Sequence, residues 1–315
     1  MSGPVVPSGD DRSHSRQELL HELAVRGRDN SALSAGERFG ILPANPRQSR
    51  PMVYLFGALA AFFFLAERLF PLRPHQGIFR RGFWTDILYV PIHFFMRVFV
   101  NGTLAVAISE VGHRYLPHSS FNILEGRPFF VQVIGILLTL DFLFYVTHRL
   151  KHRWHWWWRL HETHHSSTQM DFLASARFHP IEKLLDRTIY IFPLFFLGAS
   201  DTAILIWAGF DVFFGMMSHS NVRWNIGPLI YVFVGPEMHR WHHVKDPAIR
   251  ECNYGNNFSI FDWLFGTAYV SYDLPGEFGV DEEGFPQNNI VKQFTHAFRP
   301  SPLPSAEVDK TPQPS

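Results

Sequence analysis

Four long apolar blocks lie between two polar ends of the chain. Residues 52–70 and 129–147 form blocks of nineteen residues each, residues 84–108 form a longer block with polar interruptions, and residues 188–217 form a block broken at 198–201. About 20 apolar helical residues cross a hydrocarbon core about 30 Å thick. The first three blocks therefore predict single membrane helices, and the fourth predicts one long helix or a shallow helical hairpin.

This pattern predicts an all-α integral membrane protein with three or four transmembrane helices. The alternative is a helical enzyme with a buried core, because every block carries some polar residue. Arg47 and Arg50 precede the first block, and their positive charge leaves the exact number of spans and the orientation of the N-terminus open.

Aromatic and basic residues follow the third block directly. They are Trp154, Trp156, Trp157 and Trp158, mixed with Arg149, Lys151, Arg153 and Arg159. This composition is typical of the cytoplasmic membrane–water interface. We therefore expect residues 148–187 and 219–275 to form a helical cap that faces the cytoplasm, at the inner membrane of a bacterium or at the endoplasmic reticulum of a eukaryote.

The polar ends divide the chain into three segments. Residues 1–50 predict a disordered polar tail, and the absence of an apolar stretch in the first thirty residues argues against a cleaved secretory signal. Residues 51–275 form the membrane domain. Residues 276–315 form a C-terminal extension, which is proline-rich and predicted to be disordered from about residue 299.

Composition narrows the class of protein further. Lys+Arg and Asp+Glu balance at 28 each, so the chain lacks the excess of positive charge that would predict nucleic-acid binding. The single cysteine, Cys252, excludes an intramolecular disulfide framework and a cysteine-rich zinc module. Histidine is the unusual residue: the chain has 18, and eleven of them lie between His148 and His243.

Eight of these histidines form three tight clusters. Residues three and four apart share one face of a helix, so each cluster points two or three imidazoles toward one centre. Eight imidazoles exceed the need of one four-coordinate zinc ion and predict two metal ions a few Å apart. Imidazole suits zinc, copper, iron and nickel, so ligand type alone does not select iron. The clusters are His148 and His152; His161, His164 and His165; and His239, His242 and His243.

These clusters and their flanking sequences resemble the fatty acid hydroxylase superfamily. That superfamily includes sterol desaturases, sterol methyl oxidases and alkylglycerol monooxygenase. The resemblance covers about residues 50–275 and rests on the three clusters together with residues 141–149, 177–182, 219–221 and 253–267. Any one cluster alone would be a weak signal, whereas their combination is specific.

The resemblance implies a di-iron centre held by the eight clustered histidines, with His219 as a further ligand. Residues around the ligands are also candidates for the site. Asp141 lies two helical turns before His148, and a metal-bound histidine commonly donates its other N–H to a carboxylate, so Asp141 is a candidate to orient that ring. The other candidates are His179, Asp262, Glu162, Glu182 and Glu237.

The implied reaction is oxygen-dependent hydroxylation or desaturation of a membrane lipid, such as a sterol, a fatty acyl chain or an ether lipid. It needs two iron ions, O2 and two electrons from outside. The sequence contains neither a cysteine set for an iron–sulfur cluster nor a glycine-rich dinucleotide motif, so a separate haem or iron–sulfur carrier with its reductase, or a diffusible pterin, is implied. The basic residues around Trp154 would attract an acidic carrier or anchor the membrane surface.

Two other classes stay open at this point. A membrane zinc hydrolase would use a metal-bound water, but such sites commonly include carboxylate ligands. A non-enzymatic metal-binding membrane protein would place its ligands inside the spans, along a pathway.

Overall fold

The computed structural model describes residues 46–115, 122–198, 200–280 and 285–300. In these residues the chain forms helices joined by loops, together with three isolated β-bridges, Pro71–Val222, Phe233–Phe258 and Val244–Phe278. The fold is therefore all-helical, as predicted, across the described ranges. The predicted N-terminal tail up to residue 45 and the last fifteen residues of the C-terminal extension lie outside them.

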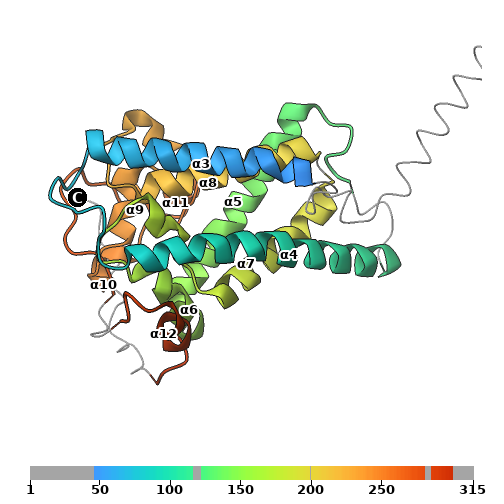
Figure 1. Ribbon diagram of the computed structural model, residues 1–315. Helices are drawn as coiled ribbons and strands as arrows, with labels where there is room; N and C mark the ends of the chain where they lie inside the picture. The colour runs from blue at the N-terminus through green and yellow to red at the C-terminus, as the bar shows by residue number, and fades with distance from the viewer. Residues whose placement is uncertain (1–45, 116–121, 199, 281–284, 301–315) are drawn as a thin grey trace, which may run out of the picture.

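Five long helices and several short ones make up the structure (Figure 1). The long helices are α3 (Pro46–Leu69), α4 (Phe83–Tyr115), α5 (Phe129–Arg153), α7 (Pro180–Leu197) and α8 (Asp201–His219). The short ones are α6 (His155–His165), η2 (Phe172–Ala176), η3 (Gly227–Tyr231), α9 (Pro236–His242), α10 (Pro247–Arg250), α11 (Ile260–Leu264) and α12 (Ile290–His296). Helix α3 begins about one turn before the predicted domain boundary at residue 51.

The long helices pack around α5, which contacts both α7 and α8, while α3 packs on α8 and α4 packs on α7. Figure 1 shows α3 and α4 in front and α5 crossing behind them. Apolar side chains fill the layers: Phe63 of α3 packs with Phe214 and Met217 of α8, and Leu140 of α5 packs with Leu194 of α7.

The fourth apolar block forms a helical hairpin, one of its two predicted forms. Helix α7 begins with Pro180 at its first turn, where a missing N–H costs nothing, and ends at Gly198. Gly198 has φ of +59°, a left-handed conformation that favours glycine, and a Cβ there would collide with Asn122. The chain therefore turns back at this glycine, and α8 starts at Asp201.

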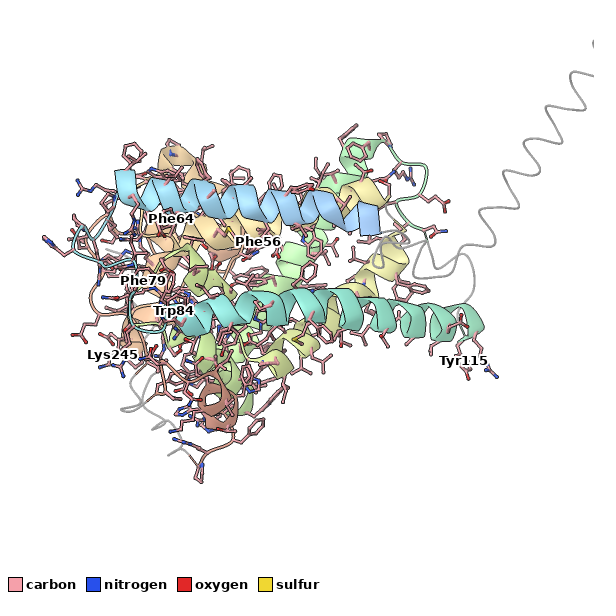
Figure 2. All side chains as sticks on the ribbon, viewed as in Figure 1. Phe56, Phe64, Phe79, Trp84, Tyr115 and Lys245 are labelled. Carbon is pink, nitrogen blue, oxygen red and sulfur yellow. The ribbon has the colours of Figure 1, made fainter. Side chains whose placement is uncertain are left out.

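Two helical segments in the described residues are long and apolar enough to cross a membrane, Phe129–Arg153 and Thr202–His219. Large apolar side chains are also exposed along the other long helices, including Tyr54 and Leu69 of α3 and Trp84 of α4. Figure 2 shows such side chains on the outer faces of α3 and α4. An apolar exterior of this extent favours contact with a membrane.

The segment after α5 corrects part of the predicted interface. Trp154 and Trp156 are about half exposed, as an interfacial position requires, but Trp157 is buried. Lys151 and Arg159 are buried as well, and both form ion pairs inside the protein. They are therefore unavailable to attract an acidic carrier or to anchor the surface, because their charges are already neutralised by neighbouring carboxylates.

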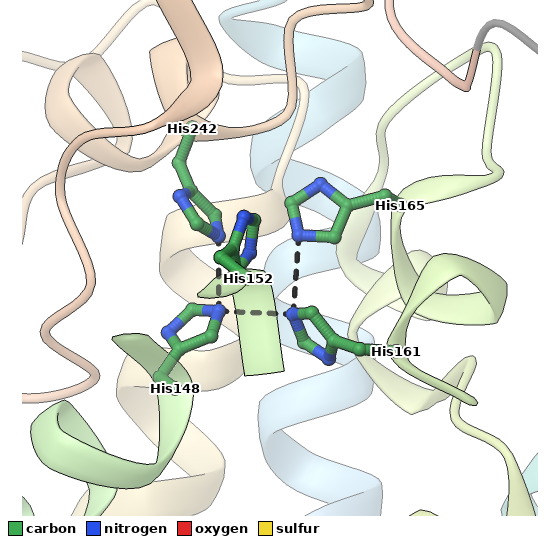
Figure 3. Close-up of side chains that lie close together, drawn as sticks. All are labelled: His148, His152, His161, His165 and His242. Carbon is green, nitrogen blue, oxygen red and sulfur yellow. Dashed lines mark hydrogen bonds between the residues drawn. The ribbon is translucent and has the colours of Figure 1, made fainter. Parts of the chain in front are cut away.

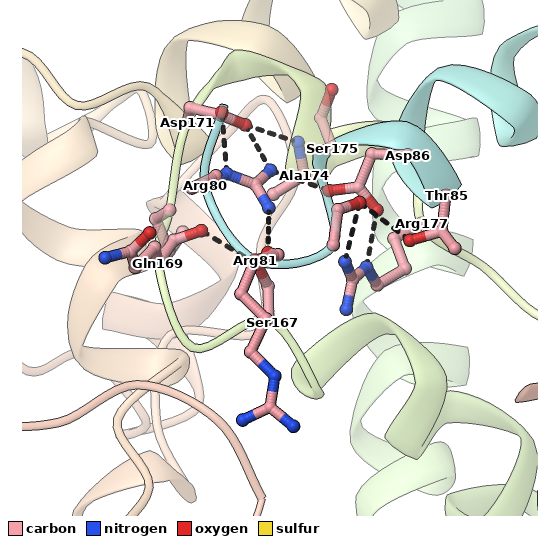
Figure 4. Close-up of polar contacts among 12 residues, drawn as sticks. Arg80, Arg81, Thr85, Asp86, Ser167, Gln169, Asp171, Ala174, Ser175 and Arg177 are labelled. Atoms are coloured by element: carbon pink, nitrogen blue, oxygen red, sulfur yellow. Dashed lines mark hydrogen bonds and ion pairs between the residues drawn. The ribbon is translucent and has the colours of Figure 1, made fainter. Parts of the chain in front are cut away.

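A network of buried charges joins α4, the loop before it and the segment around η2 (Figure 4), and a hydrogen bond from Arg177 extends it to the C-terminal extension. The Asp86 carboxylate lies between two guanidinium groups, 2.6 Å from Arg80 Nη2 and 2.6 Å from Arg177 Nε. Arg80 also donates to Asp171, and Arg177 donates to the Gln287 side chain at 2.7 Å. The buried Arg177 guanidinium needs hydrogen-bond acceptors, and Gln287 supplies one. This contact attaches residues 285–300 to the predicted membrane domain.

Replacing Asp86 with asparagine should strongly destabilise the protein. The change removes the carboxylate that pairs with the buried Arg177 guanidinium and leaves Arg80 with Asp171 as its acidic partner. Removing one partner of a buried ion pair costs about 3–5 kcal/mol. The measurement is the midpoint of thermal unfolding in detergent. Asp273→Asn is the matched control, because Asp273 is exposed. Equal midpoints for the two variants would contradict this role of Asp86.

Candidate metal centre

All nine predicted histidine ligands come together in the folded chain. Helix α5 contributes two from its last two turns, α6 contributes three, and α8 contributes one as its final residue. The last three come from α9 and the residue after it. Both candidate membrane helices therefore end in histidines of the cluster, which places the cluster at one end of the long helices.

The histidines form two groups in which one ring nitrogen of each residue lies within 4.8 Å of the others. We call them the five-histidine group and the four-histidine group. Figure 3 shows the five-histidine group, with rings from α5, α6 and α9 facing one another. The first group is His148, His152, His161, His165 and His242, and the second is His164, His219, His239 and His243.

The Nε2 atoms face the centre of each group at short range. In the five-histidine group, His148 Nε2 lies 2.9 Å from His242 Nε2 and 3.0 Å from His161 Nε2. In the four-histidine group, His219 Nε2 lies 3.2 Å from His164 Nε2 and 3.3 Å from His239 Nε2. Each group thus places several imidazole nitrogens around a single point.

The Nδ1 atoms face outward and contact hydrogen-bond acceptors. His148 Nδ1 lies 2.8 Å from the Tyr254 carbonyl oxygen, and His242 Nδ1 lies 2.7 Å from the Cys252 carbonyl oxygen. Three further rings make equivalent contacts: His164 to the Arg177 carbonyl at 3.1 Å, His219 to the Gly215 carbonyl at 2.8 Å, and His161 to the Glu182 carboxylate at 2.8 Å.

This geometry determines where the proton lies on these five rings. A carbonyl oxygen can only accept, so the Nδ1 atoms of these rings carry the hydrogen and donate it. The Nε2 atom of such a neutral ring is then unprotonated and carries a free lone pair. Lone pairs about 3 Å apart repel one another unless a cation lies between them, so the two groups fit two metal cations. A donor set made only of imidazoles suits iron, zinc, copper or nickel.

The environment keeps these rings neutral. Burial lowers the pKa of His164 and His165 well below the ordinary value, and the neighbouring imidazoles of His219 and His243 lower it further. The pKa of His242 is lowered in the same direction, chiefly by burial. Neutral imidazole is the form that binds metal, so protons compete for these ligands only under acidic conditions.

The two groups share backbone segments and lie against each other. His164 and His165 are consecutive on α6 but belong to different groups, and the same holds for His242 and His243. The rings of His165 and His243 stack with their centroids 4.4 Å apart. Two cations held by these groups would therefore be neighbours, as expected from the number of imidazoles.

Buried charges surround the five-histidine group on its outer side. Glu182 accepts from His161 and also lies 2.9 Å from the Lys151 ammonium. Lys151 in turn lies 2.8 Å from Asp186, and all three of these charged residues are almost fully buried. A carboxylate on the outer nitrogen fixes the orientation of a metal-bound ring and makes it more basic. Glu182 therefore positions His161, and Lys151 and Asp186 hold Glu182.

The predicted candidates Asp141 and Asp262 do not contact the histidine rings as expected. We expected Asp141 to accept from His148, but the Tyr254 carbonyl oxygen occupies that position. Asp141 instead accepts from the backbone N–H groups of Asn257 and Phe258, and Asp262 accepts from those of Tyr254 and Gly255. These carboxylates hold the loop whose carbonyl oxygens orient the histidines.

His179 caps a helix. Its Nδ1 accepts from the Ile181 N–H at the start of α7, and its Nε2 lies 3.0 Å from the Phe294 carbonyl oxygen. Glu162 pairs with Arg159, and Glu237 accepts from the Ile226 N–H. These interactions hold the fold around the site, and none of these three residues belongs to either histidine group of the described chain.

Sequence reasoning missed two contacts of the site. Glu251 lies 3.2 Å from His152 Nδ1, and Asp186 anchors Lys151. Asp186 follows Glu182 by one helical turn, so an i, i+4 carboxylate pair on α7 was a readable signal. Glu251 lies in a loop, where sequence spacing carries no such information.

The sequence model of the fatty acid hydroxylase family matches residues 133–267. This range runs from the second turn of α5 to beyond α11 and contains all nine histidines of the two groups. The part of the chain that builds the metal centre is thus the part that is similar in sequence to the fatty acid hydroxylase family.

Curated relatives share the same region. The chain is 34% identical over 169 residues to ornithine lipid hydroxylase OlsE of Rhizobium tropici, which covers 53% of this chain and 51% of the relative. It is 32% identical over 162 residues to alkylglycerol monooxygenase of Caenorhabditis elegans, covering 51% of this chain and 32% of the relative. Methylsterol monooxygenase 2-2 of Arabidopsis thaliana is 25% identical over 170 residues, which is 53% of this chain and 64% of the relative.

The chain therefore spans about half the length of the first relative and about a third of the second. No solved structure matches the chain. These relatives are named as enzymes that oxidise lipids, and the shared segment is the one that carries the histidines.

Replacing one histidine in each group should remove metal from that group. His242→Ala opens the five-histidine group and His164→Ala opens the four-histidine group, so each variant should retain roughly half of the wild-type metal after dialysis against a chelator. The measurement is elemental analysis of the purified chain. His75→Ala is the control, because His75 is exposed and lies outside both groups. A variant with wild-type metal content would remove its residue from the ligand set.

Replacing Glu182 with glutamine should weaken metal binding without removing a ligand. The amide lacks the charge that orients His161 and pairs with Lys151, and comparable changes cost 10–100-fold in metal affinity. The measurement is a competition titration with a metal indicator. Glu277→Gln is the control, since the Glu277 side chain is 86% exposed. Equal affinities of the two variants would show that Glu182 has no such role.

Proposed function

We propose that this protein is a membrane-bound di-iron oxygenase that hydroxylates or desaturates a lipid. The observation that carries the proposal is the convergence of nine imidazole rings on two adjacent points, within the region that matches the fatty acid hydroxylase family. The names of the lipid-oxidising relatives support the class of reaction and the class of substrate.

Bound iron would supply the oxidising power that amino-acid side chains lack for attack on an unactivated C–H bond. In hydroxylation, the lipid C–H and O2 together with two electrons and two protons give an alcohol and one water. In desaturation, the same inputs remove two hydrogens from the lipid and give two waters. A separate haem or iron–sulfur carrier with its reductase is the proposed source of both electrons.

The residues of this chain would hold the two ions and fix their surroundings. The five-histidine and four-histidine groups would provide the ligands. The outward Nδ1–H bonds of His148, His164, His219 and His242 to carbonyl oxygens would keep these four rings in a ligating orientation. Glu182 adds a negative charge behind His161. Phe178 stacks on His164 with ring centroids 4.0 Å apart and keeps water from that face of the ligand.

The proposed placement in the membrane follows from the two candidate spans. Both end at the metal centre, so the ions would lie at one membrane surface, beside the exposed Trp154 and Trp156. Exposed Arg149 and Arg153 lie at the same end, and positive charge favours the cytoplasmic side. A lipid would then reach the ions laterally from the bilayer.

A zinc hydrolase is less well supported. Hydrolytic metal sites commonly include carboxylate ligands, whereas the two groups found in the described residues contain imidazoles alone. The nearby carboxylates of Glu182 and Glu251 contact Nδ1 atoms on the outer side of the rings.

The deciding test uses the full chain purified in detergent. We expect about two irons per chain and oxygen uptake after chemical reduction, stimulated by a lipid substrate. An ornithine lipid, an alkylglycerol and a methylsterol are the first three lipids to supply, followed by mass spectrometry for added oxygen or lost hydrogen. The double variant His164→Ala/His242→Ala is the inactive control. Tightly bound zinc without oxygen uptake would overturn the proposal in favour of a hydrolase.

A further inference from the structure

A groove with a volume of about 660 Å³ lies where α6, the first turns of α7 and residues 297–300 meet. Figure 1 shows α6 beside α12, the helix that leads into the last of these segments. The groove is separate from the metal ligands and lies on the outer surface of the helical cap. Its volume falls in the range of ligand pockets, roughly 300–1,000 Å³.

The floor of the groove is apolar and continues along α7. Trp156, Leu160, Ile181, Leu185 and Phe298 line it. Ile181 is followed on the same side of α7 by other exposed residues, Leu184 and Phe192. From Ile181 to Phe192 this exposed stripe is about 16 Å long, at about 1.5 Å per helical residue.

The stripe leads away from the metal centre along the membrane layer. Helix α7 ends at Gly198, and the Ser200 N–H just beyond it donates to the Gln132 side chain near the start of α5. Helix α7 therefore runs antiparallel to the candidate span α5. A chain lying on the stripe would extend from the cap toward the far side of the bilayer.

The rim of the groove is basic. Arg299 lines the groove, and Arg153 lines an adjoining hollow that shares His155 and Trp156 with it. Both arginines are exposed. Arg159 also lines the groove, but its charge is neutralised by Glu162 at 2.9 Å. Among the described residues that line the two hollows there is no carboxylate, and the exposed arginines give this part of the rim a positive charge.

We propose that this groove binds a phospholipid with an anionic headgroup, with the phosphate between Arg153 and Arg299 and one acyl chain along Ile181, Leu184 and Phe192. The proposal rests on the membrane placement given under Proposed function. A phosphate beside exposed arginines is a favourable pairing, and the apolar stripe accounts for the chain.

A soluble acidic carrier protein fits this surface less well. An acidic carrier protein binds to a polar, positively charged surface. The groove floor instead consists of aromatic and aliphatic side chains that continue into a membrane-facing stripe. The combination of a basic rim and a long apolar floor matches the two chemically distinct parts of a phospholipid.

Native mass spectrometry of the detergent-purified full chain tests the proposal. Phosphatidylglycerol and phosphatidylcholine with identical acyl chains are titrated separately, and bound lipid is counted at each concentration. We expect phosphatidylglycerol to bind more tightly, and each of Arg153→Gln and Arg299→Gln to reduce that preference about fivefold. Arg299→Lys should retain most of it, because lysine still provides the charge.

Lys292→Gln is the matched control, since Lys292 is exposed on the neighbouring α12 and does not line the groove. It should leave the preference unchanged. Wild-type preference in the double variant Arg153→Gln/Arg299→Gln would overturn the proposal, and so would displacement of the lipid by an equal concentration of inorganic phosphate. Loss of coupling to an acidic carrier with unchanged lipid binding would assign the groove to the carrier instead.

Metal content and oxygen uptake are measured on the same preparations. The groove variants should keep both at wild-type levels, because their changes lie outside the histidine groups. Failure of the lipid-binding result with intact iron and oxygen uptake would reject the groove alone. Absence of iron in the wild-type chain would reject the proposed function, whatever the lipid result.

Discussion

The repulsion between unprotonated imidazole nitrogens is the constraint on which this structure depends. Carbonyl and carboxylate acceptors hold Nδ1–H groups on the outer side of the rings, which leaves Nε2 lone pairs about 3 Å apart at the centre of each group. A buried acceptor without a donor costs about 1–3 kcal/mol. Several such atoms gathered at one point would be strongly unfavourable, and a bound cation converts the same arrangement into a favourable one. The proposed metal binding would therefore be coupled to the folding of the cap.

The rest of the cap fixes the outer acceptors in place. Asp141 and Asp262 accept from four backbone N–H groups of the loop that supplies the Tyr254 carbonyl to His148. The network around Asp86 holds Arg177, whose carbonyl oxygen faces His164. Buried charges are expensive unless fully paired, so their concentration around the histidines has a structural reason. They make the position of each acceptor rigid, and rigid acceptors determine the orientation of the ligands.

The outer surface differs in residue composition from the interior of the cap. Apolar side chains cover the exposed faces of the long helices, whereas the polar and charged residues near the histidines are buried. A lipid-modifying enzyme needs this division, because its substrate resides in an apolar phase and its metal ions require polar support. The proposed phospholipid groove lies at the border between the two regions, where exposed arginines meet the apolar stripe of α7.

The sequence by itself determined the helical class, the four apolar blocks and the eight clustered histidines, because helical periodicity and ligand spacing are local properties. His219 stands outside the clusters, and only the family resemblance indicated it as a ligand. His148 and His152 share a helix face whatever surrounds them. Only the tertiary structure decided which histidines belong to the same group, since consecutive residues such as His164 and His165 belong to different groups. It also decided that Lys151 and Arg159 are buried ion pairs, that the Tyr254 carbonyl holds His148, and that residues 285–300 pack on the domain. These outcomes depend on contacts between residues far apart in the chain, and local spacing carries no information about them.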